Sequence, residues 1–153
     1  MKKFFTTLGA VLACLLLAGL AGFWALVHFG DRLDAEAKAY VDEAIPRIVG
    51  AWQPTELLIR ASPELLAAAP AETVAALFGE FSTRLGPLRR YQGSSGQATM
   101  GFGLGQGGST TAAFHAVVIF EHAPATINVR AIRRDGQWRI LQLVVNSDAL
   151  AAS

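Results

Sequence analysis

The feature that most constrains this chain is an uninterrupted apolar segment near its N-terminus. The twenty residues from Leu8 to Val27 contain no charged residue, no proline and no side-chain amide. As an α-helix, a segment of this length spans about 30 Å, which is the thickness of the hydrocarbon core of a bilayer. A helix covering a soluble core would carry a polar stripe, and this segment has none. We therefore expect residues 1–30 to form a transmembrane signal-anchor.

Two other interpretations of the segment stay open from the residues alone. A cleaved secretory signal would be cut after Ala21, but such signals usually hold about 7–15 apolar residues, and here the apolar run continues through Phe23–Val27. A lipoprotein would be cut before Cys14, where the bulky Leu12 fits the cleavage site poorly. The length of the segment favours a retained anchor.

The flanking charges predict the orientation of this anchor. Lys2 and Lys3 precede it without a neighbouring acid, whereas acidic residues follow it from Asp31 onward. Positive charges collect on the cytoplasmic side of membrane helices. We expect a single-pass protein of a bacterial inner membrane, with a cytoplasmic N-terminus and a periplasmic C-terminal domain.

Small residues in the anchor indicate a surface for another transmembrane helix, because small side chains let two backbones approach closely. They are Gly9, Ala13, Ala18, Gly19 and Gly22. The expected partners are the lipid bilayer and a second membrane protein or complex.

Charge and cysteine content narrow the function of the rest of the chain. Thirteen Lys and Arg, with Lys2 and Lys3 among them, stand against twelve Asp and Glu, so the part after the anchor is almost neutral. A nucleic-acid-binding surface would be strongly basic, so we expect no nucleic-acid partner. The one cysteine, Cys14, lies inside the apolar segment, which excludes a disulfide or a cysteine zinc site in the remainder.

Apolar spacing and capping residues predict helices in the first half of this remainder. They cover Leu33–Ile48, with a kink or a new segment at Pro46, then Glu56–Ala61, a stretch that starts at Ser62-Pro63, and a helix from Pro70 to Gly86. The face of the last helix consists of Val74, Leu77, Phe78, Phe81 and Leu85.

Strand patterns dominate the second half. We expect a loop at Gly93–Gly96, a short strand at Gln97–Phe102, a glycine-rich hairpin loop at Gly101–Ser109, and long strands at Thr110–Phe120, Ala125–Arg134 and Gln137–Asn146. The Asp135-Gly136 pair predicts a tight hairpin turn. Helices followed by an antiparallel meander predict an α+β domain over residues 31–148, with helices packed on a curved sheet of about four strands and a tail at 149–153.

This order of elements resembles the cystatin-like, or nuclear-transport-factor-2-like, superfamily, and in particular small bacterial extracytoplasmic members. The residues that carry the resemblance are Phe78 and Phe81 with Leu85-Gly86-Pro87-Leu88, the strand Phe114–Phe120, and the segment from Asp135 to Ile140. The resemblance implies a cystatin-like domain with a cone-shaped pocket between the concave face of the sheet and the helices. Enzymatic members use an Asp or His base with Tyr partners, and no matching pattern occurs here.

Candidate site residues are few. His115, within a strand, shares its alternation with aliphatic residues, which favours a core or pocket-lining histidine; a general base is the alternative. Trp138 and Tyr91 are the other two candidate pocket residues. The string Gly103-x-Gly105-x-x-Gly108 matches a dinucleotide-binding fingerprint, but a strand rather than a helix follows it, so a hairpin loop is the better interpretation.

Four arginines cluster around one hairpin: Arg130, Arg133, Arg134 and Arg139. Arginines on exposed strands usually make local ion pairs or protect an edge; the alternative is a surface for an anionic partner. We find no constellation for a catalytic, cofactor or metal site. The sequence therefore favours a membrane-anchored, non-catalytic extracytoplasmic interaction module, such as an accessory subunit of a larger membrane complex, over a pocket domain that binds or converts a small molecule.

Overall fold

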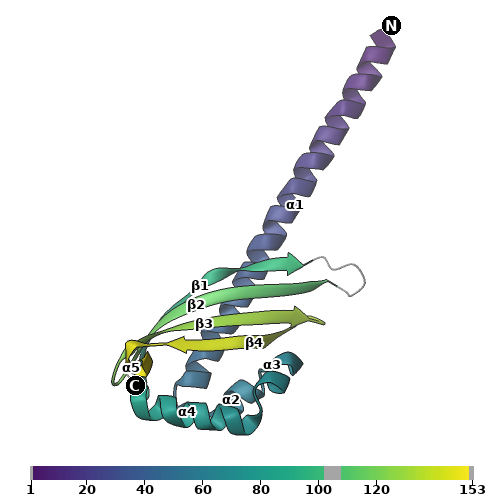
Figure 1. The fold of residues 1–153 in the computed structure, drawn as a ribbon. Coiled ribbons are helices and arrows are strands. Elements are labelled where there is room, and N and C mark those ends of the chain that lie inside the picture. The colour runs from purple at the N-terminus through teal and green to yellow at the C-terminus, as the bar shows by residue number, and fades with distance from the viewer. Residues whose placement is uncertain (1, 102–107, 152–153) are drawn as a thin grey trace. The chain divides into compact units, whose positions relative to one another are not determined.

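A computed structural model describes residues 2–101 and 108–151, without the side chains of residues 2–13. The chain divides into two compact units, residues 1–33 and 34–153. The elements are α1 (Lys2–Val49), α2 (Pro54–Leu58), α3 (Pro63–Ala68), α4 (Ala71–Leu85), β1 (Leu88–Gly101), β2 (Ser109–Phe120), β3 (Pro124–Arg134), β4 (Gln137–Asn146) and α5 (Asp148–Ala151) (Figure 1).

The first unit consists of helix α1 up to residue 33. The part of α1 from Cys14 onward includes a stretch that is long and apolar enough to cross a membrane, and none of that stretch is buried. The described chain thus has a long, apolar N-terminal helix that could span a membrane, as the sequence predicted. Gly9 and Ala13 were predicted to pack against another helix, and they lie in the part of α1 whose packing is outside the described structure.

The second unit is an α+β domain, as predicted. The later residues of α1 place Ala37, Val41, Ala44, Ile45 and Ile48 in the core, at the three- and four-residue spacing of one helical face. Pro46 does not end the helix, which continues to Val49. The N–H of Gly50 then donates to the carbonyl of Pro46 at 2.9 Å.

The sheet is an antiparallel meander in the order β1-β2-β3-β4. In β2, Ala112, Phe114, Ala116, Val118 and Phe120 are buried, and they alternate with exposed or half-buried residues. The buried face packs on α1, α2 and α4 in one core. The Asp135-Gly136 turn was correctly predicted, since both residues have positive φ (51° and 76°) between β3 and β4.

Trp52 is the centre of the aromatic part of this core. Its ring lies 5.0 Å from that of Phe120 and 5.5 Å from that of Phe78, and its indole N–H donates to the carbonyl of Gly86 at 2.9 Å. This bond joins the end of α1 to the end of α4. The side chain is a buried core residue, with 4% exposure.

Several predicted boundaries were wrong. Residues Gly93–Gly96 are not a loop but part of one long strand, β1, which contains a bulge between Tyr91 and Ser94. Position 96 of the strand accommodates only glycine. A Cβ atom there would clash with the carbonyl of Ala113 and lie 2.7 Å from the Cα of Phe114. The glycine-rich stretch 102–107 lies outside the described residues.

The helical predictions differ in smaller ways. Helix α2 starts at Pro54 and ends at Leu58, earlier than expected. Ser62 caps α3 as predicted, since its hydroxyl accepts from the N–H of Leu65 at 3.2 Å. In α4, Leu77 is 44% exposed and lies outside the buried face. The stretch expected as a tail contains most of helix α5.

Candidate functional site

The three residues predicted to line a pocket do not meet. His115 is exposed and lies on the face of β2 that points away from the core, because Phe114 and Ala116 on either side of it are buried. Tyr91 and Trp138 are half-buried and pack against the core on the other face. The pocket prediction for His115 is therefore wrong, and the reason is that the two faces of β2 are almost equally apolar.

The predicted arginine surface is also divided. Arg133 points to the core side of the sheet, where it lies 3.5 Å from Glu36 of α1. Arg134 pairs with Glu64 at 2.6 Å, and Arg139 donates to the carbonyl of Ile59 at 2.8 Å. Arg130 is exposed on the outer face of β3. Local interactions account for three of the four arginines, so they do not form one free cationic surface.

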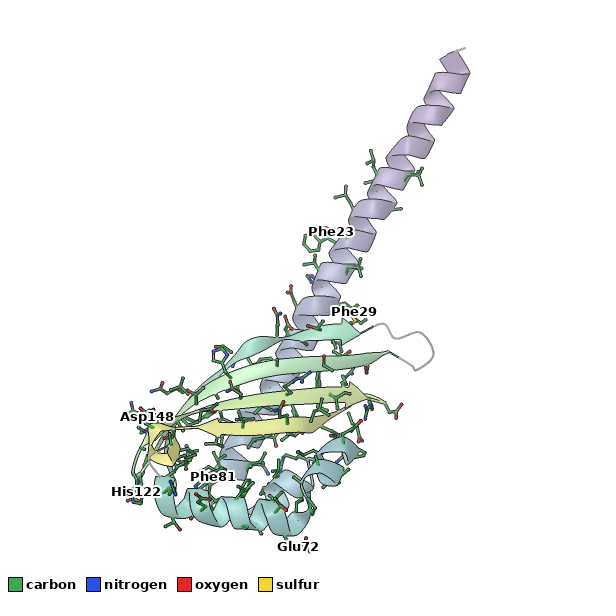
Figure 2. All side chains as sticks on the ribbon, in the orientation of Figure 1. Phe23, Phe29, Glu72, Phe81, His122 and Asp148 are labelled. Atoms are coloured by element: carbon green, nitrogen blue, oxygen red, sulfur yellow. The ribbon has the colours of Figure 1, made fainter. Side chains whose placement is uncertain are left out.

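The N-terminal unit exposes its apolar side chains. Leu15, Leu16, Leu17, Leu20, Phe23, Trp24, Leu26, Val27 and Phe29 are 47–69% exposed, and Figure 2 shows Phe23 and Phe29 projecting from α1. Gly19 and Gly22 have open space where a side chain would extend. Ala18 and Gly22, one helical turn apart, leave a shallow side of the helix, as helix packing in a membrane requires.

The domain contains a polar cluster that the sequence did not reveal, centred on Asp42 of α1. One carboxylate oxygen accepts from the Tyr91 hydroxyl at 2.6 Å and from the backbone N–H and hydroxyl of Ser94 at 3.0 and 2.7 Å. The other oxygen pairs with Lys38, one turn earlier on the helix. Ser94 is 4% exposed, at the bulge of β1.

The electrostatics of this cluster favour a structural role. Burial raises the pKa of Asp42, but hydrogen bonds from Lys38, Ser94 and Tyr91 outweigh burial and leave the pKa below its usual range. Burial and the hydrogen bond to Asp42 raise the pKa of Tyr91. Asp42 thus stays ionised and Tyr91 stays neutral at pH 7. A carboxylate with a lowered pKa is a weak base, which argues against proton transfer by this group.

Asp34 extends the same arrangement along the strand. Its carboxylate accepts from the N–H of Ala98 at 2.6 Å. Asp34 and Asp42 are eight residues apart on a helix, or about 12 Å, which matches the roughly 13 Å between Ser94 and Ala98 on an extended strand. Strand β1 is an edge of the sheet, so these carboxylates satisfy edge N–H groups that would otherwise invite pairing with another chain.

Three further polar side-chain atoms are buried, one each on α1, β3 and β4. The Tyr40 hydroxyl, the Arg133 Nε–H and the Trp138 indole N–H are buried and find no hydrogen-bond partner among the described residues. Arg133 and Trp138 are directly opposite each other across β3 and β4.

An apolar groove of about 230 Å³ borders β4 between α3 and α4. Its lining residues include Leu65, Leu77, Phe81, Leu143 and Val144. The outer edge of β4 is covered at Ile140, whose N–H and carbonyl bond to the carbonyl of Arg60 and the N–H of Ser62.

Metal chemistry finds no support in the described part of the chain. Among residues whose side chains are described, no group of three or more His, Cys, Asp or Glu side chains could hold a metal ion. The fingerprint string ending at Gly108 separates β1 from β2, two antiparallel neighbours, and no helix follows it.

The structure thus shows an α+β protein with a long apolar N-terminal helix that could span a membrane, and with a four-stranded antiparallel meander. No protein-family model matches the chain, and neither a curated protein nor a solved structure matches it significantly.

Proposed function

We propose that this chain is a membrane-anchored, non-catalytic extracytoplasmic interaction module, in the form of an accessory subunit of a larger membrane complex. The observation that carries the proposal is the exposure of every large apolar side chain between Leu15 and Phe29. Burying each such side chain gains about 1.5–3 kcal/mol, so a helix that exposes them on all sides belongs in lipid or against another helix.

The arrangement of the domain supports a cystatin-like fold at the finer level. A helix, the later part of α1, lies against one face of an antiparallel sheet whose strands follow one another in chain order. This order of elements is what the resemblance leads us to expect, and it supports the proposal of a cystatin-like fold. The fold hosts many functions, so the proposed role depends on the anchor and on the side-chain chemistry.

The flanking charges support a cytoplasmic N-terminus and a periplasmic domain in a bacterial inner membrane. Lys2 and Lys3 precede the apolar segment, and Asp31 and Asp34 follow it closely.

The chemistry of the domain supports the non-catalytic part of the proposal. The Asp42 carboxylate accepts hydrogen bonds from Tyr91 and Ser94 of β1, and its pKa is lowered. His115, the candidate base, points outward from the sheet. A general base must reach the proton that it removes, and a carboxylate whose pKa is lowered is a weak base.

A crosslinking pull-down from native membranes tests the proposal. We expect the full chain to capture a second membrane protein in defined stoichiometry. The double variant Ala18→Ile/Gly22→Ile fills the shallow side of the helix and should reduce the captured amount at least threefold. The matched variant Leu16→Ile/Leu20→Ile keeps side-chain volume and should capture the partner like the wild type. Equal capture by both variants would show that this side of the helix is not part of the interface. If the wild-type chain captured no second membrane protein, the proposal would be contradicted.

A further inference from the structure

The sheet ends in two edge strands, β1 and β4, which differ in how their outer backbone groups are paired (Figure 1). On β1, carboxylates of α1 accept from the N–H groups of Ser94 and Ala98. On β4, the N–H and the carbonyl of Ile140 are paired with the segment Arg60–Ser62. Among the described residues, no further backbone bond reaches the outer side of Gln142–Asn146. Alternate residues of an edge strand direct their N–H and carbonyl groups away from the sheet, so this stretch presents unpaired groups over roughly 17 Å.

The pairing at Ile140 indicates what kind of chain fits this edge. Ala61 forms a parallel bridge with Ile140, and the next residue, Ser62, has the extended backbone of a strand. The chain then leaves the edge, because Ser62 is the N-cap of helix α3. An extended segment is therefore already the partner of β4 at one position, while the strand itself continues to Asn146.

The apolar groove of about 230 Å³ lies beside the same unpaired stretch. Leu143, Val144 and Val145 all line it, although consecutive residues of a strand point to opposite faces, so the groove reaches the edge of β4 itself. Leu77 and Phe81 of α4 line it as well, and every lining residue is apolar. Leu77 is 44% exposed, so part of this apolar surface is open to solvent.

We propose that β4 binds an extended apolar segment of the membrane partner as an additional strand of the sheet. The backbone of that segment pairs with Gln142–Asn146, and its alternate side chains enter the groove beside Leu77 and Phe81. The inference rests on the proposed function, because it assigns the segment by which the partner contacts the domain.

Other occupants match this surface less well. A small apolar molecule would leave the edge of β4 unpaired, and the groove is smaller than the roughly 300–1,000 Å³ of ligand pockets. A helix pairs its backbone groups internally and has few to offer a strand. A second copy could offer its own β4, but its Leu143 and Val145 pack against its own core and could not fill the groove.

Two peptides that differ only in their backbones test the strand pairing. Full-length protein in nanodiscs of a zwitterionic lipid is titrated with a fluorescent peptide of alternating threonine and valine, which has a lysine at each end. Its twin carries a methyl group on every backbone nitrogen, so it has the same side chains but cannot donate to β4. We expect saturable binding of the first peptide by fluorescence anisotropy, and at least tenfold weaker binding of the twin. Absence of binding by the first peptide, or equal binding of both, would overturn the proposal.

Two matched substitutions locate the binding. Leu77→Asp places a charge in the groove and should weaken binding of the first peptide at least fivefold, because a carboxylate is costly to bury unpaired. Leu66 of α3 is similarly exposed, at 43%, and is not among the lining residues, so Leu66→Asp should bind like the wild type. Equal affinity of the two variants would refute the site. A wild-type dimer that Leu77→Asp dissociates would assign the edge to a second copy and would also refute the proposal.

Amide hydrogen exchange gives a second readout. Binding of the first peptide should slow exchange within Gln142–Asn146 and leave β1 unchanged. Slower exchange in β1, or none within Gln142–Asn146, would contradict the proposal. These measurements need no membrane partner, so their failure would leave the proposed function standing. A lone monomer in native extracts would contradict the proposed function but not the peptide binding.

Discussion

The carboxylate of Asp42 accepts hydrogen bonds from both the backbone N–H and the hydroxyl of Ser94, at 3.0 and 2.7 Å. The two residues are 52 positions apart in the sequence, and their contact fixes the bulge of β1 against helix α1. Asp34 repeats the contact at Ala98. Two N–H groups of the edge strand are thus paired with acidic side chains of helix α1.

The substitution Asp42→Asn tests how much the contact between Asp42 and β1 stabilises the domain. The amide keeps one acceptor oxygen but loses the charge that Lys38 and the donors on β1 share, so we expect a loss of about 1–2 kcal/mol in the free energy of unfolding. Urea unfolding of the full chain in detergent micelles measures it. Glu43→Gln, on an exposed part of the same helix, is the control and should change stability by less than about 0.5 kcal/mol. Equal losses in both variants would show that the contact between Asp42 and β1 adds no stability beyond that of an exposed carboxylate.

Acid should weaken the domain through the same carboxylate. Because the folded pKa of Asp42 is lowered, the unfolded state binds the proton more tightly. The stabilisation is complete above the unfolded pKa of about 3.9 and is lost as the pH falls through the lower folded value. Unfolding measured from pH 6 downward should show the loss below about pH 4. In Asp42→Asn, the loss of stability at low pH should be smaller than in the wild type. An equal loss in the variant would show that other groups cause it.

Gly96 and Gly79 should respond in opposite directions to alanine. A side chain at Gly96 would clash with the carbonyl of Ala113 and would lie 2.8 Å from the ring of Phe114, so Gly96→Ala should cost about 2–4 kcal/mol. Gly79 lies in α4 with open space around it, and Gly79→Ala should gain about 0.5–1 kcal/mol through helix propensity. Thermal unfolding compares the two. A tolerated Gly96→Ala would contradict the close packing of β1 on β2.

Cysteine labelling tests the predicted orientation. Cys14 is the one native cysteine, so Cys14→Ser gives a background for single-cysteine variants. In intact cells, Ser95→Cys, on an exposed position of β1, should react with a membrane-impermeant maleimide, and Lys2→Cys should react only after lysis. The reverse pattern would place the domain in the cytoplasm. Loss of residues before Ala21 in the mature chain would instead favour a cleaved signal.

The sequence predicted those parts of the fold that depend on local pattern. Strand β4 has the expected bounds, Ser62 caps α3, and the Asp135-Gly136 turn adopts the positive φ values that such a pair favours. Each of these depends on neighbours within a few residues. Alternation in β2 also predicted which side chains share a face.

What the sequence did not predict depends on contacts between distant segments. The alternating residues of β2 are apolar on both sides, so only the packing of α1 decides that Phe114 faces inward and His115 outward. Gly93 and Gly96 suggested a loop, but Gly93 belongs to a bulge and Gly96 makes room for Phe114. The Asp42–Ser94 contact joins residues 52 positions apart and has no local signature in the sequence.

The most direct test of the central claim is the size of the native particle. The full chain is extracted from its own membranes in a mild detergent and analysed by size-exclusion chromatography with light scattering and mass spectrometry. An interaction module should elute with a second membrane protein at a fixed ratio, and the complex should dissociate in harsh detergent. A lone monomer under the mild conditions would contradict the account.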